Sequence, residues 1–141
     1  MNKKTTFFID IALGSKELLS YLTGMGLSVE RHLDHFPPDA ADAQWIPDVS
    51  SRGWAILTAD KNIRRRAQGA RVVRYAGARL FVLSCHTMSP ANWRSIIEKH
   101  VRTAQIVAAY LPPPYKTSLT LDQMKIEWLG TDEEIADLLG T

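Results

Sequence analysis

The 141-residue chain has a single cysteine and no long apolar run, and both absences narrow the classes of protein to which it can belong. Because Cys85 has no second cysteine to pair with, an intrachain disulfide is excluded and a reducing compartment is expected. A free cysteine beside Val82 and Leu83 is typical of a buried structural thiol. The first apolar run, residues 7–9, is far too short for a signal peptide or a membrane span. We therefore expect a cytoplasmic protein with no membrane contact.

The chain also lacks a large net charge, since its formal charge is only +2. The global charge therefore does not indicate a polyanionic partner, but the distribution of charge is uneven. Seven basic residues and no acid lie between Lys61 and Arg79, whereas four aspartates lie between Asp34 and Asp48. Arg64, Arg65 and Arg66 closely follow Asp60, a candidate site residue, and guanidinium groups form bidentate hydrogen bonds with phosphate oxygens.

The hydrophobic content of 45% is enough for one domain with a real core. Apolar runs alternate with amphipathic segments and with glycine or proline breaks. This alternation predicts an α/β fold, a three-layer α/β/α domain with a mostly parallel central sheet. Strands are expected at 5–10, 27–32, 54–58, 79–84 and within 115–128, and helices at 16–22, 42–52, 61–68 (or a basic turn), 71–76 and 90–110.

Two boundaries follow from the same patterns. Pro47 is tolerated only in the first turn of a helix, so the regular part of the 42–52 helix is expected to begin near Ile46. The α/β domain is expected to span residues 1–121. Residues 122–141 would form an extension with an edge strand and a short acidic helix at 131–139.

Aspartates mark the boundaries of the expected elements in the first sixty residues. Asp10 follows the first apolar strand, Asp60 follows the strand at 54–58, and Asp42 begins the segment between them. In an open α/β sheet the carboxyl ends of the strands are where ligands bind, so these acids should lie close together. Close carboxylates repel one another, and a divalent cation with oxygen ligands offsets that repulsion. Asn62 can offer a further oxygen and Thr58 a hydroxyl.

Three stretches of the chain carry a resemblance to a known family: residues 7–10 (Phe-Phe-Ile-Asp), residues 34–47 (DHFPPDAADAQWIP) and residues 53–66 (GWAILTADKNIRRR). Together they resemble the PIN-like domains, and most closely the VapC45-type bacterial toxins. The resemblance implies an endoribonuclease dependent on Mg²⁺ or Mn²⁺, the toxin of a toxin–antitoxin pair, with a cognate antitoxin and a possible homodimer as protein partners. It makes Asp10 the first-strand acid, Asp42 the helix acid and Asp60 the acid of a Thr-x-Asp motif. Asn62 departs from the family, which commonly has a fourth acid there.

The resulting hypothesis is a nuclease in which Asp10, Asp42 and Asp60 are catalytic and bind the metal with Asn62. Ions held there would activate water and neutralise the phosphodiester transition state. RNA would be bound by the side chains that surround this centre, Arg64, Arg65 and Thr58. Trp45 and Trp54 are further candidates because they could stack on a base, although Trp54 at a strand start is more typical of a core.

Some assignments stay open. Asp39 could replace Asp42 as ligand, since an aspartate at position 42 also suits a helix N-cap. His32 and His35 flank the acidic loop and could orient a ligand or a phosphate, but a histidine with no special role is favoured. Asp34 and Asp48 are expected to be solvated or capping residues.

Two alternative functions remain. A PIN-like module that binds RNA or protein without catalysis is suggested by Asn62 and the modest net charge. A receiver-like phosphoacceptor at Asp60 is disfavoured, because Ile11 follows Asp10 where a second acid would be needed.

Overall fold

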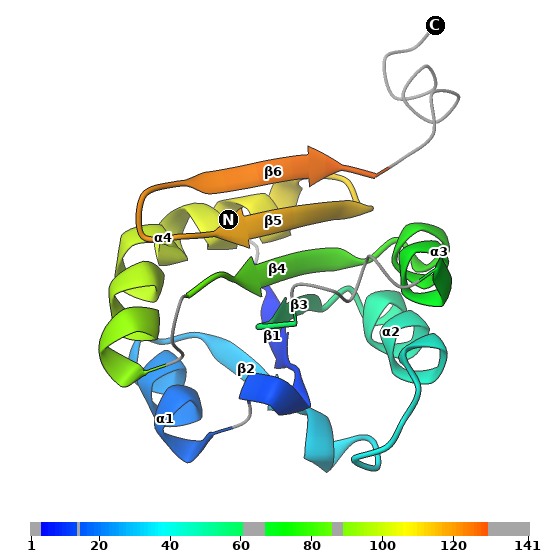
Figure 1. Ribbon diagram of the computed structural model, residues 1–141, viewed down its shortest axis with the longest axis horizontal. Helices are drawn as coiled ribbons and strands as arrows, with labels where there is room; N and C mark the ends of the chain where they lie inside the picture. Colours follow the sequence, from blue (N-terminus) through cyan, green and yellow to red (C-terminus); the bar gives the residue numbers. More distant parts are fainter. Residues whose placement is uncertain (1–3, 14, 61–66, 86–88, 130–141) are drawn as a thin grey trace, which may run out of the picture.

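A computed structural model describes residues 4–13, 15–60, 67–85 and 89–129, and its centre is one six-stranded sheet (Figure 1). The strands follow the order β2-β1-β3-β4-β5-β6. The first five are parallel and β6 is antiparallel to β5. Their bounds are β1 (Thr6–Ile9), β2 (Ser28–Arg31), β3 (Ala55–Thr58), β4 (Arg79–Leu83), β5 (Tyr115–Leu119) and β6 (Met124–Trp128). The expected mostly parallel α/β sheet is confirmed.

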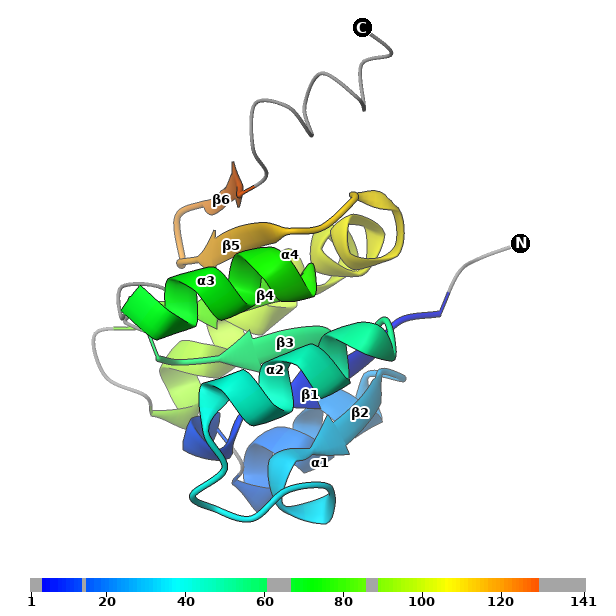
Figure 2. The same cartoon turned by 90° about the vertical axis from the view of Figure 1, so that its right-hand side faces the viewer.

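Helices cover both faces of the sheet, as Figures 1 and 2 show. Within the described residues the α-helices are α1 (Lys16–Gly24), α2 (Asp42–Ser51), α3 (Ala67–Ala76) and α4 (Pro90–Tyr110), and the 3-10 turns are η1 (Ile11–Leu13) and η2 (His32–Asp34). Successive strand residues point to opposite faces. Phe7 and Ile9 therefore pack with α1 and α4 in one core, and Phe8 packs with α2 and α3 in the other. This is the three-layer arrangement that the sequence predicted.

Phe8 is the centre of an aromatic cluster beneath α2. Its side chain is fully buried, and its ring lies 5.4 Å from that of Trp45, 5.8 Å from that of His32 and 6.0 Å from that of Phe36. Trp45 is only 2% exposed, so the prediction that it could stack on an RNA base is wrong. The indole instead joins α2 to β1.

Helix α2 differs from the sequence prediction at its start. It begins at Asp42, runs through Pro47, and has Ala41 as its N-cap, so Asp42 is a first-turn residue and not the cap. A proline inside a helix removes one hydrogen bond. The helix continues because Ile46 and Val49, on either side of Pro47, are both fully buried in the core. Packing thus outweighs the local preference.

Helix α3 also differs, because it is continuous from Ala67 to Ala76 where we expected a break between residues 68 and 71. The strand β6 closes one edge of the same sheet through a hairpin at Asp122–Gln123, as expected. The acidic helix predicted at 131–139 lies outside the described residues. Within the described part of the chain, no helix combines the length and apolarity needed to cross a membrane.

Candidate functional site

The strand order places a topological switch point at the carboxyl ends of β1 and β3. These two strands are neighbours in the sheet, yet the helix that follows β1 packs on one face and the helix that follows β3 packs on the other. In open α/β sheets such a divergence of connections is where ligands bind. Asp10 directly follows β1, and Asp60 lies two residues beyond β3, so both predicted acids are at this switch point.

Asp10 is held by both of its carboxylate oxygens. Oδ1 accepts a hydrogen bond from the backbone N–H of Ile11 at 2.7 Å, and Oδ2 accepts one from the Thr58 hydroxyl at 2.7 Å. The Asp10 backbone N–H donates to the Leu57 carbonyl at 3.0 Å, which continues the β1–β3 pairing. With 7% of its surface exposed, Asp10 is a buried acid whose orientation is fixed.

Thr58 connects Asp10 to Asp60. Its Oγ1 donates to Asp10 and accepts the Asp60 backbone N–H at 3.0 Å. We predicted Thr58 as an RNA-binding residue, but the side chain is 0% exposed and its hydroxyl is used inside the protein. Thr58 is therefore a positioning residue that ties the two candidate ligands together.

Burial raises the pKa of Asp10 above its ordinary value of 3.8, because an ionised carboxylate loses hydration inside the protein. The hydrogen bonds from Thr58 and Ile11 and the nearby His32 oppose this effect and lower the pKa. The charge of Asp42 raises it further. Asp42 is thus close enough for its charge to act on Asp10.

The electrostatics of Asp10 suit a cation. A buried carboxylate that carries a neighbour of like charge is stabilised when a cation binds to it. Among the described residues no group of three His, Cys, Asp or Glu side chains is gathered around one point. Mg²⁺ commonly binds through one or two carboxylates and keeps several waters, so Asp10 with Asp60 or Asp42 is a donor set of the right chemistry.

The structure distinguishes Asp42 from its alternative, Asp39. Asp39 is exposed, whereas Asp42 is half-buried and its charge acts on Asp10. Asp34 and Asp48 form ion pairs with Arg31 and Arg52, both at 2.7 Å and on the protein surface. Asn62, Arg64 and Arg65 lie outside the described residues.

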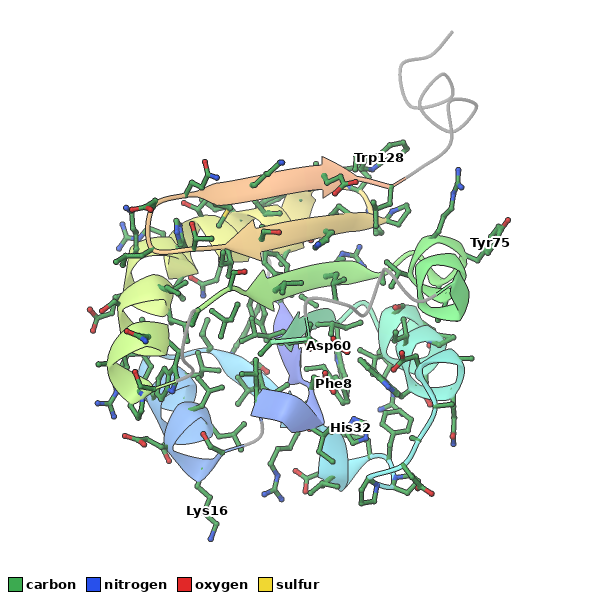
Figure 3. The ribbon with its side chains drawn as sticks, viewed as in Figure 1. Phe8, Lys16, His32, Asp60, Tyr75 and Trp128 are labelled. Atoms are coloured by element: carbon green, nitrogen blue, oxygen red, sulfur yellow. The ribbon has the colours of Figure 1, made fainter. Side chains whose placement is uncertain are left out.

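Sequence reasoning missed His32. Its side chain is 2% exposed, its Nε2 lies 3.1 Å from the Pro37 carbonyl, and its Nδ1 has no hydrogen-bond partner in the described part of the chain. No local pattern marks this residue: Asp10 and His32 are neighbours because Ile9 pairs with Arg31 in the sheet, and each follows the end of its strand. Figure 3 shows Phe8 between His32 and Asp60 in this view.

The comparison with protein families agrees with this geometry. The sequence matches the family described as "PIN like domain" over residues 5–85, which is more than half of the 141-residue chain. The protein belongs to this PIN-like domain family. The matched part runs from β1 through β4 and includes Asp10, Asp42 and Asp60. No curated protein and no solved structure matches the chain. PIN-like domains are commonly nucleases that use Mg²⁺ or Mn²⁺.

Proposed function

We propose that the protein is a metal-dependent endoribonuclease that hydrolyses RNA phosphodiesters at the switch point where β1 and β3 end. One observation carries the proposal: the Thr58 hydroxyl joins the buried Asp10 carboxylate to the backbone of Asp60 at the carboxyl ends of two neighbouring strands. This network fixes the Asp10 carboxylate and the backbone of Asp60 with no need for substrate. Membership of the PIN-like family supports the same chemistry.

In this proposal Asp10 and Asp60 hold Mg²⁺ or Mn²⁺, with Asp42 as the third acid and Asn62 as a neutral oxygen donor. The ion, when bound, activates water and neutralises the charge that develops on the phosphodiester. The protein's own contribution is orientation. Thr58 and the Ile11 N–H fix both Asp10 oxygens before any ion arrives. This pre-organisation lowers the cost of assembling the charged site.

RNA binding is proposed to depend on Arg64 and Arg65, which follow Asp60 closely in the chain. Guanidinium groups form bidentate hydrogen bonds with phosphate oxygens. Such contacts raise affinity without reading the base sequence, and they weaken as salt is added. We therefore expect RNA cleavage to fall with rising ionic strength.

We further propose that the nuclease is the toxin of a VapC45-type toxin–antitoxin pair, with a cognate antitoxin as its protein partner and a homodimer as its own assembly. The resemblance of residues 34–66 to that branch supports this proposal. Induced expression should arrest growth, and co-expression of a small protein encoded beside the gene should restore it. Growth that continues at high expression of the active protein argues against the toxin role.

The nuclease proposal is tested by cleavage of a labelled RNA in Mg²⁺, in Mn²⁺ and in EDTA. We expect cleavage with either ion and none in EDTA, and we expect Asp10→Asn and Asp60→Asn to reduce the rate at least about a hundredfold. Asp39→Asn is the matched control, because it removes an exposed aspartate near the same loop and should leave the rate unchanged.

Undiminished cleavage by Asp10→Asn or Asp60→Asn defeats the assignment of these acids. Titration calorimetry separates the nuclease from the binding module that Asn62 suggests. RNA binding with no measurable affinity for Mg²⁺ or Mn²⁺ would favour the non-catalytic module.

A further inference from the structure

A pocket lies at the opposite end of the sheet from Asp10 and Asp60. It has a volume of about 360 Å³ and is formed where β1, β3 and β4 begin. We call it the rear pocket, and the described residues that line it are Lys4, Thr5, Thr6, Arg52, Gly53, Trp54, Arg79, Ala108 and Ala109. Figure 2 shows the yellow C-terminal end of α4 on the side of the sheet where the chain enters β1. The PIN-like carboxylates contribute nothing to this pocket.

The rear pocket is strongly basic. Three cationic side chains line it, and no acidic residue is among its described lining residues. Arg52 is partly neutralised by Asp48, since its Nε lies 2.7 Å from the Asp48 Oδ1. Neither Lys4 nor Arg79 has an ion pair with any described residue. The pocket therefore carries an excess of positive charge that the described protein does not compensate.

Arg79 is the residue that most clearly needs a ligand. Its Nε is buried and has no hydrogen-bond partner within the described residues, although the residue lines the pocket. A buried polar group without a partner costs free energy, and a charged one costs more. The buried Nε is itself closed to a ligand, but an oxyanion that met the rest of the guanidinium from the pocket would compensate its charge, because a guanidinium donates in a fork that fits two oxygens of a phosphate.

The neighbouring groups complete a site for a phosphate. The hydroxyls of Thr5 and Thr6 can donate to further oxygens, and Thr6 already shares a hydrogen bond of 3.0 Å with Ser28. Ala108 and Ala109 leave room at the wall formed by α4. Trp54 is excluded as a base platform, because its ring already stacks on Phe8 and carries the Arg52 guanidinium at 4.9 Å from its centroid.

We propose that the rear pocket binds a phosphate group through Lys4 and Arg79. The phosphate belongs either to RNA or to a free phosphate compound, and the chemistry is the same for both. The strands that separate the rear pocket from Asp10 are four residues long, or about 13 Å at the usual rise per strand residue. The rear pocket is thus a separate site, and its occupancy does not depend on the nuclease chemistry.

The experiment follows backbone amide signals by NMR while inorganic phosphate is added at constant ionic strength in EDTA. The signals of Thr6, Gly53 and Arg79 should shift and saturate. Lys4→Gln and Arg79→Gln should each weaken the apparent affinity at least about tenfold, which is the usual effect of losing one charged hydrogen-bond donor. Lys125→Gln removes one exposed positive charge from β6 and is the matched control.

A parallel titration with a six-nucleotide RNA, with and without a 5′-phosphate, identifies the source of the phosphate. If Lys4→Gln and Arg79→Gln lose as much affinity for RNA as for inorganic phosphate, the pocket binds RNA. If they lose affinity for inorganic phosphate alone, the pocket binds a free phosphate compound. Shifts that do not saturate, or equal affinities in Lys4→Gln and Lys125→Gln, overturn the proposal. Lys4 is exposed, so its variant stays folded even if Arg79→Gln does not. The same binding should persist in Asp10→Asn, which keeps this result distinct from any failure of the nuclease proposal.

Discussion

The substitution Thr58→Val tests the link between the two acids with little change of shape. Valine has nearly the volume of threonine but no hydroxyl. It would remove the 2.7 Å hydrogen bond to Asp10 Oδ2 and the acceptor for the Asp60 N–H at 3.0 Å. The first involves a charged group and contributes about 1.5–3 kcal/mol, and the second contributes about 1 kcal/mol. We expect the free energy of unfolding to fall by about 2–4 kcal/mol.

Thr117→Val is the matched control. Thr117 is also a fully buried strand threonine, but its Oγ1 has no hydrogen-bond partner among the described residues. Removing an unsatisfied buried hydroxyl relieves a desolvation cost, so this variant should be neutral or should gain about 1 kcal/mol. The same change from threonine to valine should therefore lower the free energy of unfolding at position 58 and leave it unchanged or raise it at position 117.

The pH dependence of Thr58→Val carries further information. The Thr58 hydrogen bond lowers the pKa of Asp10, so it stabilises the ionised form more than the neutral one. The loss of stability should be largest at neutral pH and smaller at about pH 3, where the carboxyl is protonated. Urea denaturation at both pH values gives the comparison. An equal loss of unfolding free energy in Thr58→Val and Thr117→Val would refute the reasoning, and so would a loss in Thr58→Val that does not change with pH.

Thr58→Ser separates stability from catalysis. It keeps the hydroxyl and loses one buried methyl group, which costs about 1 kcal/mol. Cleavage should be nearly normal in this variant, whereas Thr58→Val should lower kcat about ten- to a hundredfold with little change in KM, because the hydrogen bonds that orient Asp10 and the backbone of Asp60 are lost.

Three further outcomes are expected. Burial raises the pKa of Asp10, so the folded state holds the carboxyl proton of Asp10 more tightly than the unfolded state does. Without metal, the free energy of unfolding should therefore fall as pH rises from 3.8 through the pKa of Asp10 in the folded state. Asp10→Asn should melt at a higher temperature than the parent in EDTA at pH 7 but not at about pH 3, and a lower melting temperature at pH 7 would contradict this. Added Mg²⁺ should raise the melting temperature of the parent and not that of Asp10→Asn, since an ion that binds only the folded state stabilises it. Phe8→Ala should lower the free energy of unfolding by about 3–5 kcal/mol in urea, because Phe8 is 0% exposed and contacts the whole aromatic cluster; a loss under about 1 kcal/mol would show that the cluster does not support β1.

The sequence was sufficient for the central sheet because the strands are short apolar runs with clear ends. Phe7, Phe8 and Ile9 serve two cores at once, so they had to be continuous and apolar, and such a run is easy to recognise. The acid that follows it, Asp10, was predictable for the same reason. The long helix from Pro90 to Tyr110 was predictable from its capping serine and its apolar stripe.

Other features depend on tertiary contacts that local patterns do not contain. Pro47 is a helix breaker by local rules, but the burial of its neighbours in the core holds α2 together. Trp45 was predicted to be able to stack on a base, whereas α2 directs it onto Phe8. The roles of Thr58 and His32 arise from the register between β1 and the strands beside it, and a register is a property of paired strands.

The central claim is that the carboxylates at the ends of β1 and β3 form one cation site, and anomalous diffraction from a crystal soaked in Mn²⁺ tests it most directly. We expect an anomalous peak within about 2.1–2.3 Å of an Asp10 carboxylate oxygen, shared with Asp60 or Asp42, and no such peak in an Asp10→Asn crystal. A peak elsewhere on the molecule, or an unchanged peak in Asp10→Asn, would contradict the account.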